Sequence, residues 1–227
     1  MSAGVVWAAP ALAVQGGAAF PARHVWCVGR NYAEHAREMG ADPAAAEPIF
    51  FSKPAAALLQ SGRVRYPANT AELHHEVELV VALGRGGRDL DARAALACVE
   101  FYAVGVDLTR RDVQAKAKAA GHPWEMSKAF DQSAPLGLLV PAAAWSPSAD
   151  ARISLYVGDQ LRQRAGLGDM IWDVGELLAL LSARVTLQPG DLVFTGTPAG
   201  VGPLQPGDSV LAEVEGLPAL EFRIVRA

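Results

Sequence analysis

Two glutamates at alternate positions carry the clearest chemical signal in the sequence. Glu76 and Glu78 lie in a His-His-Glu-Val-Glu run that opens a predicted strand over residues 76–83. Side chains two residues apart on a strand project from the same face, so the two carboxylates lie close together. Ionised carboxylates at that spacing repel each other, and a buried pair requires a cation or a shared proton. Asp107, at the end of another predicted strand, offers a third oxygen ligand.

These three carboxylates favour a hard cation, Mg²⁺ or Mn²⁺ before Zn²⁺, because no thiolate accompanies them. His74 falls on the same face as the glutamates, so a mixed nitrogen and oxygen site stays open. An edge strand with a solvated acidic face would explain the same residues without any metal.

A second candidate pair lies on a short predicted helix. His35 and Glu38 are three residues apart and can touch. A carboxylate on one imidazole nitrogen raises the basicity of the ring and leaves the other nitrogen to deprotonate water. A polar surface helix with an incidental pair is the alternative. Arg30, just before the helix, suits either a substrate carboxylate or a surface cap.

Several cationic and polar residues are candidates for binding an anionic substrate. Lys53 and Lys128 each lie among apolar residues, where a lysine either extends its ammonium to water or holds an anion. Arg111 and Gln114 begin a predicted helix just after Asp107, and the positive end of a helix favours anions. The glycine-rich loop 195–202 includes Thr197 and suits gripping a carboxylate, although turn formation alone would explain its glycines.

The length and composition support one compact domain, or one with a small annex. The chain has 227 residues, of which 51% are hydrophobic and 19% charged, with a formal net charge of -4. This excludes intrinsic disorder, which needs low hydrophobicity, and argues against nucleic acid as the main partner, which calls for a basic face. The two cysteines, Cys27 and Cys98, are far apart and form neither a disulfide framework nor a thiolate zinc site.

The first 22 residues carry no side-chain charge, which invites comparison with an export signal or a membrane span. A signal peptide needs a positive region before its apolar stretch, whereas the first basic residue here is Arg23. Prolines and glycines interrupt the stretch too often for a span. We therefore expect residues 1–22 to be an N-terminal strand and loop of a cytoplasmic protein that has no membrane partner.

Short strands and helices must position these candidate residues. The pattern predicts strands over 24–28, 48–53, 76–83, 101–107 and 153–157, and helices over 32–39, 91–98, 109–121 and 173–183. Thr109 with Asp112, and Asp173 with Glu176, have the spacing of helix capping boxes. A Gln-Pro-Gly-Asp turn occurs at 188–191 and again at 205–208, each before a strand. The sum is an α+β domain dominated by β structure.

Six short motifs in order resemble the fumarylacetoacetate hydrolase family, in particular its short acylpyruvase and oxaloacetate decarboxylase-like members. Each motif alone is weak, but six in the family's order cover nearly everything from Val25 to the C-terminus. They are VGRNYAEH at 28–35, FSKP at 51–54, HHEVEL at 74–79, GVDLTRRDVQ at 105–114, SKAFD at 127–131 and TGTPAGVGP at 195–203.

The resemblance implies a mixed β-roll with short peripheral helices, formed by residues 23–227, and a homodimer. It implies that Mg²⁺ or Mn²⁺ binds the three acidic residues, and that His35 and Glu38 form a water-activating dyad. Lys128 would stabilise developing negative charge. The residues expected to contact substrate oxygens are Arg30, Arg111, Gln114 and Thr197.

The expected function is hydrolysis of a 2,4-dioxo acid, an acylpyruvate such as fumarylpyruvate from aromatic catabolism. Water activated by the dyad would attack the 4-carbonyl and expel a pyruvate enolate that the metal stabilises. Oxaloacetate decarboxylation or keto–enol tautomerisation would use the same metal site without attacking water. In a third alternative, from another class, the carboxylates bind a metal only to hold the fold together.

Overall fold

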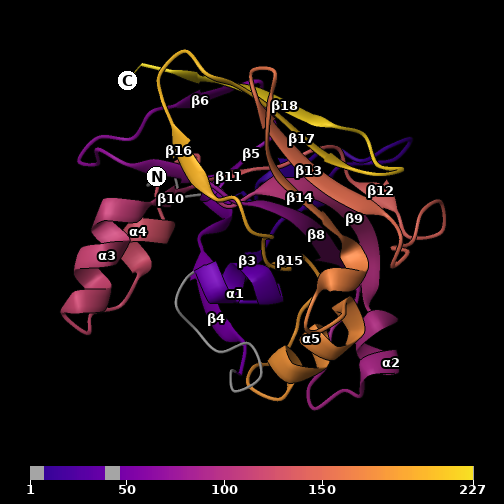
Figure 1. The fold of residues 1–227 in the computed structure, drawn as a ribbon. Helices are drawn as coiled ribbons and strands as arrows, with labels where there is room; N and C mark the ends of the chain where they lie inside the picture. The colour runs from indigo at the N-terminus through magenta and orange to yellow at the C-terminus, as the bar shows by residue number, and fades with distance from the viewer. Residues whose placement is uncertain (1–7, 39–46, 227) are drawn as a thin grey trace, which may run out of the picture.

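The computed structural model describes residues 8–38 and 47–226 and contains two large sheets (Figure 1). The six-stranded sheet has the order β12-β9-β8-β15-β3-β4. Its strands are β12 (Val140–Pro141), β9 (Val99–Val106), β8 (Val77–Leu83), β15 (Asp191–Phe194), β3 (His24–Gly29) and β4 (Ile49–Lys53). β15 pairs in parallel with β3 and antiparallel with β8, so the sheet is mixed.

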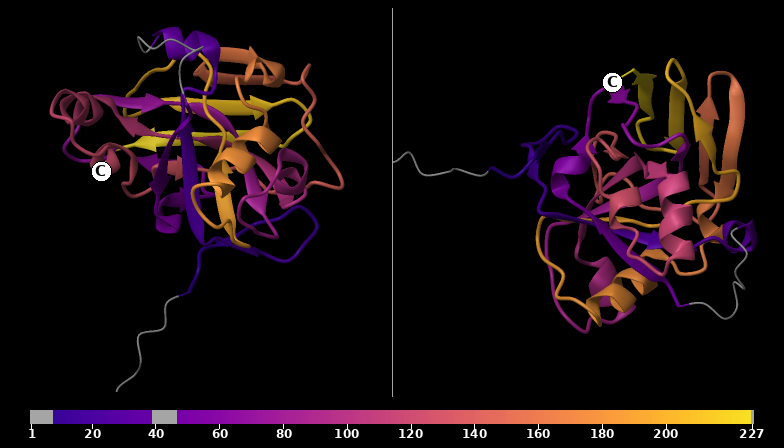
Figure 2. Two further views of the ribbon diagram at one scale, coloured as in Figure 1. Left: turned by 90° about the horizontal axis from the view of Figure 1, so that it is seen from below. Right: turned by 90° about the vertical axis from the view of Figure 1, so that its left-hand side faces the viewer.

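The five-stranded sheet covers one face of the first and has the order β14-β13-β17-β18-β6 (Figures 1 and 2). Its strands are β14 (Gln160–Gly166), β13 (Arg152–Val157), β17 (Ser209–Val214), β18 (Leu220–Val225) and β6 (Arg63–Arg65). Alternate side chains such as Ile153, Leu155 and Ala212 enter a core shared by the two sheets. The alternation is that of strands with one buried face, as the sequence predicts for 153–157 and its hairpin.

The central strand β8 is buried on both faces, and its two faces contribute to different cores. Leu79, Val81 and Leu83 pack into the core shared with the five-stranded sheet. Val80 and Ala82 pack on the opposite face, in a second core that includes Leu12 and Phe20 of the N-terminal segment. Glu78 has the parity of this second face. Glu78 is 1% exposed, and β8 lies between β9 and β15 in the interior of the sheet, which removes the solvated edge-strand alternative.

The chain changes sheets at Glu76. Before it, β7 (Leu73–His75) lies in a three-stranded sheet between β10 (Thr109–Arg110) and β16 (Gly202–Leu204). After it, β8 enters the six-stranded sheet. The sequence predicts one strand from Glu76 onward, whereas the structure leaves Glu76 at the junction. The Asp107 amide donates to the Glu76 carbonyl at 2.8 Å, so the two acidic residues lie directly opposite each other.

The helices are short and lie at the periphery (Figure 1). They are α1 (Ala33–Glu38), α2 (Ala92–Leu96), α3 (Arg111–Ala119), α4 (Glu125–Lys128) and α5 (Val174–Ser182). The capping box of Asp173 with Glu176 is confirmed at the start of α5. The predicted end of the first helix at Met39 lies outside the described residues. Within the described part of the chain, no helix has the length and apolar character needed to cross a membrane.

The capping box predicted at Thr109 and Asp112 is wrong. Thr109 pairs with His74 in the β10–β7 ladder, and α3 begins at Arg111 without a side-chain cap. The Asp112 carboxylate instead accepts hydrogen bonds from the Thr70 hydroxyl at 2.5 Å and the Ala71 amide at 3.2 Å. A distant loop thus competes successfully for the carboxylate that the local spacing assigns to the helix terminus.

Two pairs of short strands and two similar turns add to the two large sheets. β1 (Ala11–Leu12) pairs with β2 (Phe20–Pro21), and β5 (Leu58–Leu59) pairs with β11 (Ala134–Pro135). Both Gln-Pro-Gly-Asp segments form the same turn, in which Asp191 or Asp208 accepts a hydrogen bond from the amide of the turn's first residue. The predicted class, α+β with predominant β structure and short peripheral helices, is confirmed.

Gly105 yields a first prediction, about stability. It lies in β9 opposite Glu78, and a Cβ there would meet Val80 Cγ2 at 2.5 Å and Phe194 Cε1 at 2.7 Å. Gly105→Ala should therefore lower the free energy of unfolding by about 1–3 kcal/mol, the usual effect of overpacking a core. Urea denaturation monitored by circular dichroism in chelator measures it. Gly62→Ala, where the nearest atom is 3.9 Å away, should change little; an equal effect at both sites would contradict the packing argument.

Candidate active site

The three predicted carboxylates meet in the structure. Glu76, Glu78 and Asp107 each offer an oxygen within 4.8 Å of the others, and all three residues are buried. Glu76 comes from the junction between sheets, Glu78 from β8, and Asp107 follows β9. His74 lies outside this group: its Nδ1 faces Arg111 Nε at 3.4 Å, and burial together with Arg111 lowers its pKa to about 4. Among the described residues the candidate donor set is all oxygen.

Three cations balance two of the carboxylates. Lys128 Nζ lies 2.7 Å from both Glu76 Oε2 and Asp107 Oδ2. Lys53 Nζ lies 2.8 Å from Asp107 Oδ1, and Arg111 contacts Glu76 Oε1. Burial alone would raise the pKa of Glu76, but the charges of Lys128 and Arg111 outweigh it and hold that pKa well below its usual range. Burial likewise opposes the charge of Lys128, yet Asp107 and Glu76 raise its pKa.

Glu78 is the carboxylate without a cation. Its hydrogen bond comes from the Gly196 amide at 2.6 Å, and no ion pair joins it to a described residue. Burial, followed by the charges of Asp107 and Glu76, raises the pKa of Glu78 well above its usual value. A divalent cation between the three groups would relieve this repulsion, and an all-carboxylate donor set suits Mg²⁺ or Mn²⁺. The residues present therefore fit the expected metal.

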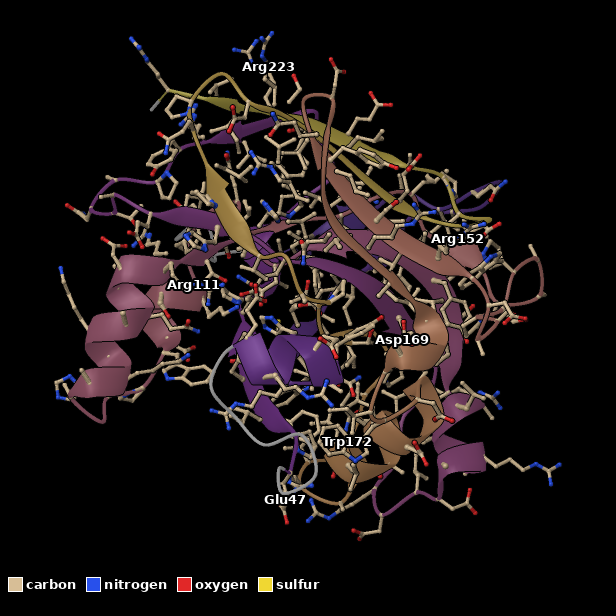
Figure 3. All side chains as sticks on the ribbon, viewed as in Figure 1. Glu47, Arg111, Arg152, Asp169, Trp172 and Arg223 are labelled. Carbon is tan, nitrogen blue, oxygen red and sulfur yellow. The ribbon has the colours of Figure 1, made fainter. Side chains whose placement is uncertain are left out.

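Asn31 anchors the loop that contacts Glu78. Gly196 has a φ of +100°, and a Cβ there would lie 2.7 Å from Asn31 Cβ. The buried Asn31 amide donates to the carbonyls of Thr195 at 2.7 Å and Trp172 at 3.0 Å, and accepts from the Trp172 amide at 2.8 Å. Figure 3 labels Trp172 beside α5, below α1. The turn that leads into α1 is thereby fixed against two segments more than 140 residues away in sequence.

An open cleft lies over the carboxylates, and most of the predicted site residues line it. Arg111, labelled in Figure 3, lies in the region between α3 and α1. The lining includes Glu76 and the predicted residues Arg30, His35, Arg111, Gln114, Lys128 and Thr197. Lys53 is not brought there: it is fully buried beneath the site, where it also donates to the carbonyl of Leu108 at 3.1 Å.

The His35–Glu38 pair forms on α1 at the edge of this cleft. His35 Nδ1 lies 3.2 Å from Glu38 Oε2, and the imidazole is almost fully buried while the carboxylate is partly exposed. The other carboxylate oxygen of Glu38 accepts a hydrogen bond from the Gly200 amide at 3.4 Å. With Nδ1 engaged, the Nε2 atom of the ring is the nitrogen available to a molecule in the cleft.

The opposite wall carries positive charge along one face of α3. Arg111, Gln114 and Lys118 all line the cleft, and Arg111 Nη1 donates to Gln114 Oε1 at 2.6 Å. Lys118 was missed in the sequence, although its spacing of four from Gln114 and seven from Arg111 is the signal of a shared helical face. Its ammonium lies 5.0 Å from the centre of the Trp124 ring. Arg30 adds a further cation from the β3–α1 turn, with a φ of 66°.

Gln163 was also missed, and here the sequence offers no signal. It lies in β14 between two exposed arginines, where nothing marks one glutamine as buried. Its amide nevertheless reaches Thr197 Oγ1 at 2.8 Å and the Pro198 carbonyl at 2.8 Å. Such contacts depend on the docking of the five-stranded sheet onto the loop after β15.

Comparisons with known proteins agree with this architecture. The profile described as "Fumarylacetoacetate (FAA) hydrolase C-terminal" matches residues 24–225. The crystal structure of fumarylpyruvate hydrolase from Pseudomonas aeruginosa in complex with Mn²⁺ and pyruvate is similar to this structure. Its TM-score is 0.96, and the two chains are 45% identical over 100% of each.

Two relatives are similar in sequence. A mitochondrial oxaloacetate tautomerase from Oryza sativa subsp. japonica is 40% identical over 201 residues, which cover 87% of each chain. An oxaloacetate decarboxylase, mitochondrial, from Dictyostelium discoideum is 38% identical over 206 residues, covering 89% of this chain and 94% of its own. Motifs, fold and profile lead to one assignment, and the chain belongs to the fumarylacetoacetate hydrolase family.

Proposed function

We propose that this protein hydrolyses the C–C bond of a 2,4-dioxo acid, an acylpyruvate such as fumarylpyruvate, to pyruvate and a carboxylic acid. Mg²⁺ or Mn²⁺ would be held by Glu76, Glu78 and Asp107. The observation that carries the proposal is the His35–Glu38 pair on the edge of the cleft above these carboxylates. Hydrolysis needs a base for water, and a histidine oriented by a carboxylate is suited to that role.

The proton transfers follow from this pair. His35 Nε2 accepts a proton from water while Glu38 holds Nδ1, and the water oxygen forms a bond to C4 of the dioxo acid. The C3–C4 bond then breaks, and its electron pair leaves on C3 as the enolate of pyruvate. The proton that His35 accepted from water is returned to C3, which completes pyruvate and regenerates the neutral imidazole, and the acyl carbon departs as the carboxylic acid.

The remaining lining residues bind and orient the substrate. A divalent cation, when bound, supplies Lewis-acid stabilisation of the oxo-acid oxygens. Thr197 and Gln114 offer polar groups to the carboxylate and oxo oxygens, and Arg111 adds charge beside Glu76. Lys128 would compensate negative charge that develops near C4, as expected from the sequence, while its ammonium keeps Glu76 and Asp107 together.

The length of the α3 face favours a long dicarboxylate. Arg111 and Lys118 are seven residues apart, about 10 Å along the helix axis. An extended carbon chain spans about 3.6 Å per three bonds, so the end carboxyl carbons of fumarylpyruvate lie about 7 Å apart and those of oxaloacetate about 3.6 Å. Burial, then the charges of Arg111 and Arg30, lower the pKa of Lys118, although Glu76 opposes the shift. Lys118 thus lies near two other cations of the cleft. We propose that Lys118 binds the distal carboxylate of the acyl group.

Oxaloacetate tautomerisation or decarboxylation is the second candidate function. Two relatives with those activities in their names support it. Neither reaction needs an attacking water. Decarboxylation would leave the dyad without a role as a base, whereas tautomerisation moves a proton between C3 and the 2-oxo oxygen and could use His35 for that transfer. A non-catalytic metal site would not explain the polar and charged side chains that line the cleft.

Incubating the Mg²⁺- or Mn²⁺-loaded protein with fumarylpyruvate, acetylpyruvate and oxaloacetate separates the candidate functions. The proposal expects the fastest turnover with fumarylpyruvate.

Metal binding can be tested without turnover, through Glu78. At 100 times its dissociation constant, Mn²⁺ should stabilise the wild-type protein by about 2.7 kcal/mol, seen as a rise in Tm. Glu78→Gln should lose most of that rise, yet its Tm in EDTA should not fall, because the change removes an unpaired buried charge. Glu221→Gln, on the exposed side of β18, is the control and should keep the wild-type rise. An undiminished rise in Glu78→Gln would exclude this ligand.

A His35 variant distinguishes hydrolysis of an acylpyruvate from decarboxylation of oxaloacetate. His35→Ala should reduce acylpyruvate hydrolysis by on the order of 10²- to 10⁴-fold, the usual contribution of a positioned base. Metal-assisted decarboxylation of oxaloacetate, if present, should fall much less. Both rates are measured at saturating metal, with Glu34→Gln on the exposed side of α1 as the control. Unchanged hydrolysis would refute the dyad, and equal loss of both activities would mean that His35 positions substrate.

Lys118 is tested by comparing two acylpyruvates. Lys118→Met removes the ammonium and keeps the apolar stem over Trp124. It should raise KM for fumarylpyruvate on the order of tenfold, the lower range for a hydrogen bond to a charged group. KM for acetylpyruvate, which has no distal carboxylate, should stay unchanged. Lys116→Met, exposed on the same helix and outside the cleft lining, is the control; equal effects on both substrates would place the distal carboxylate elsewhere.

A further inference from the structure

The orientation of the Gln163 side-chain amide is determined by two backbone groups. Gln163 is 1% exposed. The Val77 amide, which can only donate, lies 3.1 Å from Gln163 Oε1. The Pro198 carbonyl, which can only accept, lies 2.8 Å from Gln163 Nε2. The oxygen therefore faces β8 and the nitrogen faces the loop after β15, and exchanging them would leave both contacts unfavourable.

With the amide fixed, the roles of its other two partners follow. His75 Nδ1 lies 2.9 Å from Gln163 Oε1, so that ring nitrogen must carry the proton and donate it. Gln163 Nε2 donates its second hydrogen to Thr197 Oγ1 at 2.8 Å. All four hydrogen-bonding positions of the amide are thereby occupied. The side chain has no freedom to reverse any one of these bonds without losing another.

The consequence falls on Thr197. Its hydroxyl oxygen accepts from Gln163, which leaves its own hydrogen for another acceptor, and Thr197 lines the cleft. We propose that Gln163 is a positioning residue that fixes the Thr197 hydroxyl as a hydrogen-bond donor toward an oxygen of the bound oxo acid. This inference rests on the proposed use of the cleft for an oxo acid. Gln163, a buried residue outside the cleft lining, would thus determine that Thr197, which lines the cleft, donates its hydrogen bond to the ligand.

The same amide also couples the two halves of the site. Val77 stands between Glu76 and Glu78, and Thr197 stands one residue after Gly196, whose amide donates to Glu78. Gln163 therefore bridges the strand that carries the carboxylates and the loop that carries the substrate donor. A change at this position should act on substrate binding through Thr197 and leave the exposed surface unaltered.

A double-mutant cycle tests the proposal. Glutamate at position 163, when ionised, cannot donate, so the Thr197 hydroxyl would turn and donate to it. Gln163→Glu and Thr197→Val should each weaken pyruvate binding on the order of tenfold, the contribution of one hydrogen bond to a charged group. The double variant should bind no more weakly than the weaker single variant, because both changes remove the same donor. Calorimetric titration of the Mn²⁺-saturated protein with pyruvate provides the dissociation constants.

Matched variants make the outcome specific. Thr197→Ser keeps a hydroxyl and should bind pyruvate more tightly than Thr197→Val. Gln160→Glu, exposed at the start of β14, is the neutral control. Additive losses in the double variant, or wild-type affinity in Gln163→Glu, would overturn the proposal. If the Gln163 variants do not fold, the comparison of Thr197→Val with Thr197→Ser decides: equal affinities for pyruvate would also overturn it.

The cycle is independent of which reaction the protein catalyses. Pyruvate binding requires no turnover, so a coupled cycle in a protein that hydrolyses no acylpyruvate would refute the proposed function and leave the role of Gln163 intact. Conversely, if the protein hydrolyses acylpyruvates but the losses of pyruvate affinity are additive in the double variant, the proposed function stands and the proposed role of Gln163 is refuted. Absence of pyruvate binding by the loaded wild-type protein would overturn this inference directly, and Mn²⁺ titration of each variant shows that the metal site is filled.

Discussion

The repulsion between three buried carboxylates is the constraint around which this molecule is organised. Placing Glu76, Glu78 and Asp107 together out of water is unfavourable unless positive charge accompanies them. The chain supplies that charge from three separate segments, through Lys53, Lys128 and Arg111. Together the three cations pair with Glu76 and Asp107, and they leave Glu78 unpaired. The imbalance at Glu78 is what a divalent ion would correct.

The two walls of the cleft divide the chemistry. On one side α1 presents an imidazole held by a carboxylate, and on the other α3 presents cations and an amide along a single face. In the proposed reaction, proton transfer and anion binding would thereby be kept apart, so that Glu38 would not neutralise the cations proposed to hold the substrate. Within the described residues, the only ion pair of Arg111 is with Glu76, which places its charge near the carboxylates instead of at the mouth.

The sequence predicted those features that depend on neighbours along the chain. The shared face of Glu76 and Glu78 follows from strand periodicity, and His35 reaches Glu38 because helical spacing brings them together. The roles of Asn31 and Gln163 could not be predicted in this way, because their hydrogen-bond partners are remote in sequence. Asn31 and Thr195 are 164 residues apart, and Gln163 and Thr197 are 34 residues apart. Asp112 shows the opposite failure, since a local rule predicted a cap where the loop at Thr70 competed for the carboxylate. Hydrogen bonds between residues far apart in sequence cannot be predicted from the periodicity of helices and strands.

The parallel pairing of β3 with β15 has a kinetic consequence. It joins His24 to Asp191 and Cys27 to Phe194, so the centre of the six-stranded sheet closes only when segments 167 residues apart meet. Closing so long a loop costs entropy before its contacts form, which slows folding relative to chains dominated by local contacts. Gly196, whose amide donates to Glu78, lies two residues after the end of β15. During synthesis, the chain therefore lacks the hydrogen bond from Gly196 to Glu78 until nearly all of its residues have been added. The carboxylate site is accordingly completed among the last elements of the fold.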